Sequence, residues 1–373
     1  MEVLLQNFQN IQLNEVIMWA IGGVLIYLAI AKEMEPTLLL PMGFGAILVN
    51  LPVAVEGTGV QHVLDTLFAI GIEGAELFPL MLFIGIGAMI DFQPLLTNPK
   101  LMIFGAAAQF GIFFTLALAS LLGFEIQDAA SIAIIGAADG PTSIFVATEL
   151  GSKYLGAIMV AAYSYMALVP LVQPPIIKLC TTKAERKIKM RYTGKPVSKL
   201  TKILFPIMVT IIVAMVAPDA VALIGFLMFG NLIRECGVLD SLSETAQKVL
   251  ANLITIFLGI SIASQMKASE FLQFDTLLII GLGLFAFIFD TVGGIMIAKL
   301  MNLFSKEKIN PMIGAAGISA FPMSARVVHK LGLAEDNQNF LLMHYVGVNV
   351  SGQIASVIAG GLILALVKAM IGG

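Results

Sequence analysis

GAADGPTSIF, residues 136–145, interrupts an otherwise apolar stretch of the chain and decides the fold that we expect. Its Gly140-Pro141 pair cannot continue an α-helix comfortably, because proline lacks a backbone donor and clashes with the preceding turn. Asp139 places a carboxylate at the same point. We therefore expect a helix that breaks at this aspartate.

The composition identifies the surroundings of this break. Of the 373 residues, 58% are hydrophobic and 12% are charged, whereas a soluble domain carries about 25% charged residues. Apolar stretches such as 101–122 and 277–300 are long enough for the ~20 residues that cross a bilayer. The sequence therefore predicts an all-α, polytopic membrane protein. Inside a membrane, a broken backbone persists only where protein or a polar cavity satisfies it.

The charges are concentrated in one segment. Residues 181–202 hold eight of the 21 Lys and Arg residues and a single acid, Glu185. Because basic loops stay on the cytoplasmic side of a membrane, we expect a cytoplasmic linker here. No aromatic platform or recognition motif accompanies these charges, so nucleic-acid binding is not expected. The two cysteines and three histidines have no metal-type spacing, so a disulfide or a transition-metal site is not expected either.

The sequence on one side of this linker resembles the sequence on the other side. Three collinear matches indicate a duplicated unit. They are IGAADG (135–140) with IGAAG (313–317), PTSIFVATELG (141–151) with PMSARVVHKLG (322–332), and FIGIGAMIDF (83–92) with FLGISIASQM (257–266).

The repeat predicts the membrane topology. Each half contains about six apolar segments, and the fifth carries the glycine-rich, proline-broken motif. If that segment is broken or re-entrant, each half has about five membrane-crossing helices, and two consecutive halves are inverted. We expect repeats at 1–180 and 203–373, joined by the linker 181–202. Paired broken segments in two repeats indicate a transporter-type binding site.

The first break has the chemistry of a cation site. An intramembrane acid costs about 2.5–3.5 kcal/mol at the centre of a helix, so Asp139 requires a reason. Thr142 and Ser143 add hydroxyls, and a broken helix adds free carbonyls. These are the hard oxygen ligands that Na⁺ prefers. The aspartate can therefore hold a cation and a proton in turn.

The second break offers neutral oxygens. Asn310, Ser319 and Ser324 can donate oxygen ligands, and Gly314 permits close approach of the backbone. Arg326 follows the break and has two interpretations. It is either a snorkelling cation near the cytoplasmic side or a fork that binds an anionic group such as a carboxylate.

Four more polar residues lie within apolar segments. Asn349 and Ser351 are either ligands or interhelical hydrogen-bonding groups. Tyr165 is either functional or a structural anchor. Asp290 is a second intramembrane acid, with a fixed helix contact as its alternative role.

Three motifs in order carry a resemblance to a known family. They are GAADGPTSIF (136–145), NPMIGAAGISAFPMSARV (310–327) and VNVSGQIAS (348–356). The chain resembles, from about residue 16 onward, the integral-membrane β subunit of the sodium-pumping, biotin-dependent decarboxylases. That family includes the oxaloacetate, methylmalonyl-CoA and glutaconyl-CoA enzymes. The chain is compact for the family, which favours an acyl-CoA system.

The resemblance implies a function. In this family a carboxyltransferase α subunit moves carbon dioxide onto the biotin of a biotin-carrier protein. The β subunit then decarboxylates carboxybiotin, consumes a proton and exports Na⁺. The resemblance also implies a small single-span membrane subunit, a homo-oligomer, surrounding lipid, and the inner membrane of a prokaryote. A stand-alone sodium–proton antiporter or sodium–carboxylate symporter is the alternative, because it would use the same broken repeats.

The resemblance and the residue chemistry together give the expected site. We expect Asp139, Tyr165 and Arg326 to be catalytic. We expect the sodium site to draw on Asp139, Thr142, Ser143, Asn310, Gly314, Ser319 and Asn349, with Ser324, Ser351 and Asp290 as weaker candidates.

Overall fold

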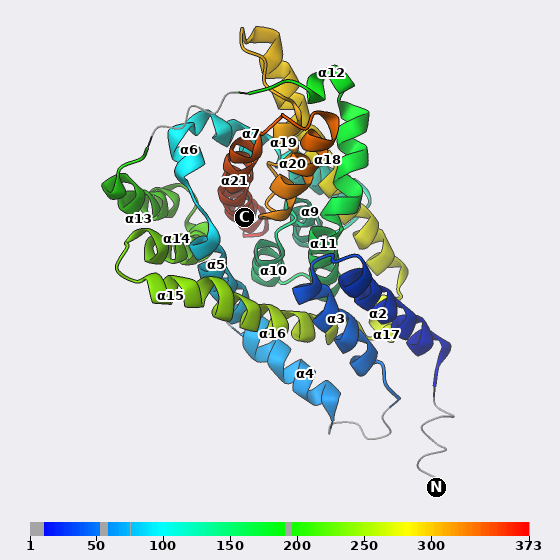
Figure 1. Cartoon of the computed structure of the whole chain (residues 1–373). Coiled ribbons are helices and arrows are strands. Elements are labelled where there is room, and N and C mark those ends of the chain that lie inside the picture. The colour runs from blue at the N-terminus through cyan, green and yellow to red at the C-terminus, as the bar shows by residue number, and fades with distance from the viewer. Residues whose placement is uncertain (1–10, 53–58, 75, 191–195, 373) are drawn as a thin grey trace.

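The computed structural model describes residues 11–52, 59–74, 76–190 and 196–372. These residues form helices and no strand (Figure 1). Seven of the described helices are long and apolar enough to cross a membrane, and an eighth span results if the bent pair 60–73 and 77–89 counts as one. The expectation of an all-α, polytopic membrane protein is therefore confirmed. Residues 191–195 of the expected linker lie outside the described residues.

The first half follows the apolar pattern, with short additional helices that the pattern did not predict, α4 and α6 among them. Pro36 begins α3, at a position where the missing backbone donor is not needed. The helices are α2 (Leu13–Ala31), α3 (Pro36–Val49), α4 (Val60–Phe68), η1 (Ala69–Glu73), α5 (Leu77–Met89), α6 (Gln93–Thr97), η2 (Pro99–Leu101), α7 (Met102–Ala107), α8 (Phe110–Leu121), α9 (Ile126–Ala133), η3 (Ile134–Ala137), α10 (Gly140–Glu149) and α11 (Leu155–Cys180).

The second half repeats this order after the linker. The Ser198 hydroxyl caps α13 by accepting a hydrogen bond from the Thr201 backbone N–H at 3.1 Å. The linker contains the short helix α12 (Lys183–Arg186). The helices that follow are α13 (Lys199–Val216), η4 (Pro218–Ala220), α14 (Val221–Glu235), α15 (Asp240–Glu244), η5 (Thr245–Leu250), α16 (Ala251–Ala263), α17 (Ala268–Phe271), α18 (Phe274–Phe304), α19 (Met312–Ala315), α20 (Met323–Glu335) and α21 (Leu342–Ile371).

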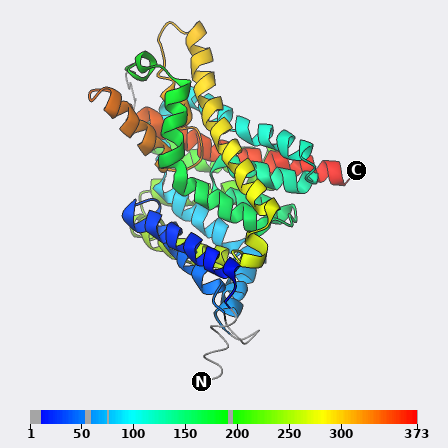
Figure 2. The same ribbon diagram turned by 90° about the vertical axis from the view of Figure 1, so that its right-hand side faces the viewer.

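The helices form two groups, and each group contains helices from both halves. The flanking group comprises α2–α5 and α13–α16, which lie along the left and the bottom of Figure 1. The break group comprises α7–α11 and α18–α21, which fill the centre. Figure 2 shows α18, in yellow and orange, alongside green α11. The two halves are therefore interleaved in space.

Packing between the halves is reciprocal. In the flanking group, α3 packs on α16 while α5 packs on α14. In the break group, α11 packs on α18 while α21 packs on α7. A π-helical stretch also precedes corresponding helices, with η1 before α5 and η5 before α16. These pairs of corresponding helices thus make equivalent contacts between the two halves.

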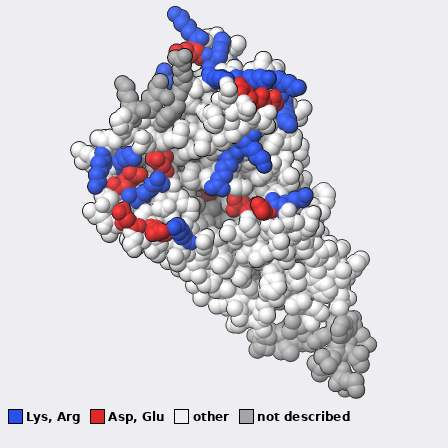
Figure 3. All heavy atoms as spheres, in the orientation of Figure 1, with Lys and Arg blue, Asp and Glu red and all other residues white. Residues whose placement is uncertain are grey.

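The outer surface agrees with a lipid environment. On the face drawn in Figure 3, Lys, Arg, Asp and Glu gather in the upper part, and the lower part over α2, α3 and α16 is mainly uncharged. Many large apolar side chains are exposed there, including Val24, Tyr27, Ile30 and Phe44. Such a surface would aggregate in water, but it suits a bilayer.

Candidate functional site

Both fifth segments are interrupted helices. In the first, α9 tightens into the 3₁₀ turn η3, Ala138 adopts a left-handed conformation (φ 51°), and α10 begins after Asp139. In the second, α19 ends at Ala315 and α20 begins at Met323. Asp139 occupies the N-cap position of α10, where the helix dipole favours a negative charge.

The two breaks meet in the interior. The backbone N–H of Ser319 donates a hydrogen bond to the backbone carbonyl of Ala137 at 3.1 Å. The Ser319 hydroxyl donates to the Gly352 carbonyl at 3.1 Å, which ties the second break to α21. Ser319 and Ala137 belong to different halves of the sequence, so this bond joins the two halves. The free backbone groups of one break therefore help to satisfy those of the other.

The Asp139 carboxylate is buried, with 3% of the residue exposed. Its Oδ2 accepts three hydrogen bonds: from the Thr142 hydroxyl at 2.8 Å, the Gln353 side-chain amide at 2.8 Å and the Ser356 hydroxyl at 3.2 Å. Its Oδ1 takes part in none of these three bonds. Three side chains from two helices therefore fix the orientation of this carboxylate through one of its oxygens.

Two of these partners were missed by the sequence reasoning. Gln353 and Ser356 lie on α21, more than 200 positions from Asp139. The sequence did contain a signal for Gln353. It follows a tyrosine by eight residues, as Gln173 does in the other repeat. Gln173 in turn donates to the Ala315 carbonyl at 2.6 Å, beside the second break. The last helix of each half thus supplies a glutamine to the break of the other half.

Three of the expected sodium ligands lie around the meeting point. The Ser143 hydroxyl donates to the Asp139 carbonyl at 2.9 Å. Asn349 donates its side-chain N–H to the Ile318 carbonyl at 2.7 Å, and its Oδ1 has no hydrogen-bond partner among the described residues. Ser143, Ser319 and Asn349 are all buried.

Asn310 and Gly314 lie in structural contacts. The Asn310 amide donates to the backbone carbonyls of Arg186 and Ile188, at 2.8 and 2.9 Å, and so fastens the linker to the second break. Gly314 packs directly on Gly294 of α18, where a β-carbon on Gly314 would lie 1.9 Å from the Gly294 carbonyl oxygen. These contacts give a packing reason for an asparagine at position 310 and for a glycine at position 314.

The weaker candidates are spread through the break group. The Ser324 hydroxyl donates to the Ala315 carbonyl at 3.0 Å, within the second break. The Ser351 hydroxyl donates to the Leu101 carbonyl at 3.0 Å. The Oδ1 of buried Asp290 accepts from the Ile112 backbone N–H at 3.2 Å, at the start of α8. Its Oδ2 has no partner among the described residues.

Tyr165 and Arg326 are not brought into contact with Asp139 by any recorded bond. The Tyr165 hydroxyl donates to the Ile280 carbonyl of α18. Arg326 is exposed on α20, and no ion pair is recorded for it among the described residues; its charge acts on Glu35, at the start of α3. Arg326 is thus an exposed cation of α20 whose charge reaches the start of α3.

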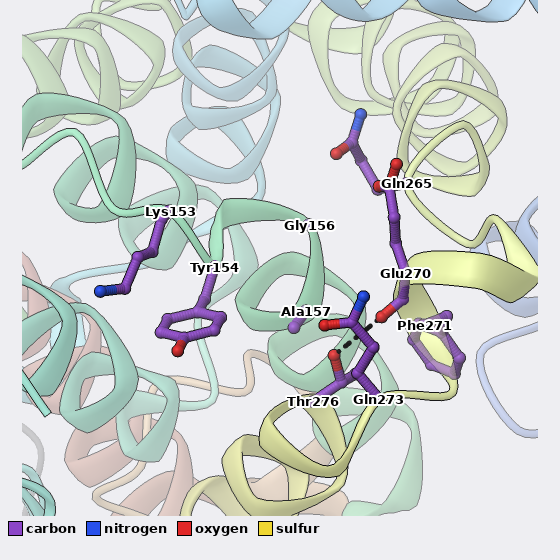
Figure 4. A pocket seen from close by; sticks show the side chains of 9 residues that line it. All are labelled: Lys153, Tyr154, Gly156, Ala157, Gln265, Glu270, Phe271, Gln273 and Thr276. Atoms are coloured by element: carbon purple, nitrogen blue, oxygen red, sulfur yellow. Dashed lines mark hydrogen bonds between the residues drawn. The ribbon is translucent and has the colours of Figure 1, made fainter. Parts of the chain in front are cut away.

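Two cavities lie at opposite ends of the break group. A cavity of about 780 Å³ lies next to the linker and is lined by Lys100, Lys189, Lys308 and His344 among others. Figure 4 shows the other, of about 230 Å³, between the start of α11 and the loop before α18. In that view the Thr276 hydroxyl donates to the Glu270 carbonyl at 3.2 Å.

Comparison with known proteins identifies the family. Residues 14–367 match the family described as the Na⁺-transporting oxaloacetate decarboxylase beta subunit. The chain belongs to this family. Methylmalonyl-CoA decarboxylase subunit beta of Propionigenium modestum is 48% identical, over 96% of each chain. Glutaconyl-CoA decarboxylase subunit beta of Acidaminococcus fermentans is 49% identical, over 94% of this chain and 92% of its own length.

An oxaloacetate enzyme is also among the relatives. The oxaloacetate decarboxylase beta chain of Klebsiella pneumoniae is 45% identical, over 96% of each chain. The family resemblance that the three motifs indicated is therefore confirmed. Together with the apolar helices, membership makes the chain a multi-pass protein of the inner membrane and a subunit of a larger enzyme.

Proposed function

We propose that this chain is the membrane subunit of a sodium-pumping, biotin-dependent decarboxylase. It decarboxylates carboxybiotin, consumes a proton and couples this reaction to the export of Na⁺. The family match over 14–367 favours this function over a stand-alone secondary transporter. The structural observation that supports it is the buried Asp139, which lies where the two broken helices meet and is oriented by three side chains.

Asp139 is the exchange site in this proposal. The three donors on Oδ2 hold the carboxylate in one orientation whether or not Oδ1 carries an ion. Na⁺ and a proton compete for Oδ1, so binding one releases the other. This competition prevents slippage, because export of a charge against the membrane potential costs about 2.3 kcal/mol per 100 mV. Thr142, Ser143, Ser319 and Asn349 are the nearby neutral oxygens.

The reaction at carboxybiotin needs a held carboxylate and a proton. Carboxybiotin is an anionic carbamate, and a proton delivered to its ureido nitrogen allows the N–C bond to break and carbon dioxide to leave. In this proposal Arg326 holds the carboxylate as a bidentate fork. Asp139 releases the proton when Na⁺ binds. Tyr165, which belongs to the same group of helices, offers a further hydroxyl along the path of that proton.

The first test concerns Arg326. Arg326→Lys keeps the charge but replaces a planar fork with a point charge. We expect the concentration of free carboxybiotin that gives half-maximal decarboxylation to rise about tenfold, the effect of roughly 1.4 kcal/mol. The sodium concentration for half-maximal rate should change much less. The decarboxylation rate measured against both concentrations checks this. A snorkelling arginine would leave both values as in the wild type.

We further propose that the halves 1–180 and 203–373 are inverted repeats joined by a cytoplasmic linker 181–202. Their reciprocal packing and crossed glutamines support a two-fold relation. One end of α21 lies by the linker, because His344 and Lys189 line the same cavity. The other end lies by the α10–α11 turn, because Lys368 pairs with Glu149 at 2.8 Å.

Labelling from the two sides of the membrane tests this topology. The native cysteines, Cys180 and Cys236, are free and can be replaced by serine. In that background, a cysteine at exposed Lys187 should react with an impermeant maleimide only from the cytoplasmic side, and one at exposed Gly372 only from the outside. If both react from the same side, the odd number of crossings per half is wrong.

The partners follow from the family. A β subunit implies a complex, and we propose a carboxyltransferase α subunit, a biotin-carrier protein and a small single-span membrane subunit, in a homo-oligomeric assembly. Relatives from acyl-CoA decarboxylases are 48–50% identical, against 44–45% for those from oxaloacetate decarboxylases. We therefore favour an acyl-CoA system, which assays of the purified complex on each substrate test directly.

A further inference from the structure

Tyr163 on α11 carries a hydroxyl that the mechanism above does not use. The residue is 1% exposed, and its hydroxyl oxygen has no hydrogen-bond partner among the described residues. A buried polar group that is left unpaired costs about 1–3 kcal/mol. An unpaired hydroxyl inside a packed membrane protein therefore requires an explanation from the groups around it.

Gly140 brings this hydroxyl to the first break. A β-carbon on Gly140 would lie 2.3 Å from Tyr163 Cζ, the ring carbon that bears the hydroxyl, and 2.5 Å from each neighbouring ring carbon. Only glycine at the first residue of α10 lets the ring lie so close. Gly140 directly follows Asp139, and the Asp139 charge acts on the Tyr163 hydroxyl.

The Asp139 carboxylate is held in a fixed orientation beside this ring. Oδ2 of Asp139 accepts from Thr142, Gln353 and Ser356, while Oδ1 takes part in none of these bonds. Na⁺ is a hard cation that gathers several oxygen ligands, both charged and neutral. We propose that the Tyr163 hydroxyl oxygen is a ligand of the Na⁺ held at Asp139 Oδ1. This inference rests on the proposed exchange at Asp139 and adds a residue to that site.

The neighbouring tyrosine does not provide this oxygen. Two residues along a helix differ by about 200° in direction, so Tyr163 and Tyr165 lie on nearly opposite faces of α11. The Tyr165 hydroxyl donates to the Ile280 carbonyl of α18. Tyr163 instead lies against Gly140 at the first break and belongs to the hydrophobic cluster that includes Ile144 of α10.

The test is to remove this one oxygen. Tyr163→Phe keeps the ring against Gly140 and deletes the hydroxyl. In the reconstituted complex, we expect the sodium concentration for half-maximal decarboxylation to rise about tenfold, with a maximal rate within about twofold of the wild type. The preference for Na⁺ over Li⁺ should also change. If Tyr163 served packing alone, its replacement would not change the sodium requirement or the preference for Na⁺ over Li⁺ while sparing the maximal rate.

Tyr345→Phe is the matched control. Tyr345 is also fully buried with an unpaired hydroxyl, but it lies against Gly332 and His329 of α20. We expect its sodium dependence to equal that of the wild type. If Tyr163→Phe assembles poorly, Gly140→Ala, which displaces the ring, should raise the sodium requirement in the same direction.

The outcomes separate this inference from the proposed function. If Tyr163→Phe lowers the maximal rate but leaves the half-saturating sodium concentration unchanged, the hydroxyl is not a ligand and the inference is wrong. If loss of the Asp139 carboxylate also leaves pumping intact, the exchange site itself is wrong. An inactive Asp139 variant beside an unchanged Tyr163→Phe overturns only the inference.

Discussion

Asp139→Asn is expected to abolish carboxybiotin decarboxylation and sodium transport together, each by about 100-fold or more, the usual cost of losing a general acid. The amide has the same size, and its oxygen can still accept from Thr142, Gln353 and Ser356. Its nitrogen then takes the place of Oδ1 and can neither exchange a proton nor bind a cation. The subunit should therefore assemble normally and still fail at both steps.

The experiment measures three activities of the same purified complex. These are ²²Na⁺ uptake into vesicles, decarboxylation of carboxybiotin, and carboxyl transfer to biotin, which should survive because it resides on another subunit. Asp128→Asn is the matched control. Asp128 is a buried acid of α9, but it is bonded to the Ser152 hydroxyl at 2.8 Å and to Lys153 at 3.3 Å, far along the segment from the break. It should keep its activity.

Continued pumping by a well-assembled Asp139→Asn protein would contradict the exchange mechanism. Asp290 would then be the next candidate, because it is a fully buried intramembrane acid and its Oδ2 is unpaired among the described residues. That oxygen lies near Gly136, where a β-carbon would come within 2.8 Å of it. It therefore approaches the first break from the side of α18.

Much of the fold could be predicted, because two strong physical signals determine it. The long apolar segments require membrane helices, and the proline in GAADGPTSIF requires a break. The helix α4 (Val60–Phe68) could not be predicted in this way, since its sequence VQHVLDTLF mixes polar and apolar residues. The sequence also could not predict that helices of the two halves pack between one another, because apolar composition does not specify which helices pack together.

The site shows a similar division. Asp139, Thr142 and Ser143 come from one short motif and lie together in the structure, and their role as sodium ligands stays a prediction. Gln353 and Ser356 were missed because their role depends on a contact between distant helices. Nothing local in the sequence around Asn310 or Gly314 distinguishes an ion ligand from a group that packs against a neighbouring backbone.

The crossed glutamines suggest how the site is kept intact. Gln353 of α21 bonds the carboxylate at the first break, and Gln173 of α11 bonds the Ala315 carbonyl at the second. Ser319 joins the two breaks directly through its bond to Ala137. Any displacement of one broken helix therefore strains the other, so we expect α10 and α19 to move as one unit with α11 and α21.

The largest structural effect is expected at Gly314. In Gly314→Ala the β-carbon would lie 1.9 Å from the Gly294 carbonyl oxygen and 2.3 Å from its carbon, both of which are backbone atoms of α18. Neither can rotate away, so α19 must shift, at a cost of about 3 kcal/mol. We expect a lower thermal midpoint in detergent and much less assembled complex, which size-exclusion chromatography with thermal challenge measures.

Two further variants test whether the contact between Gly314 and Gly294 causes this loss of stability and assembly. Gly294→Ala should reproduce the defect, since its β-carbon would lie 2.1 Å from the Gly314 carbonyl oxygen. Gly281→Ala, on the same helix α18 but with no neighbour within 4 Å, should be as stable as the wild type. If Gly314→Ala instead assembles with a normal thermal midpoint and only its sodium affinity falls, then Gly314 belongs to the ion site, as the family resemblance implied, and its contact with Gly294 is incidental.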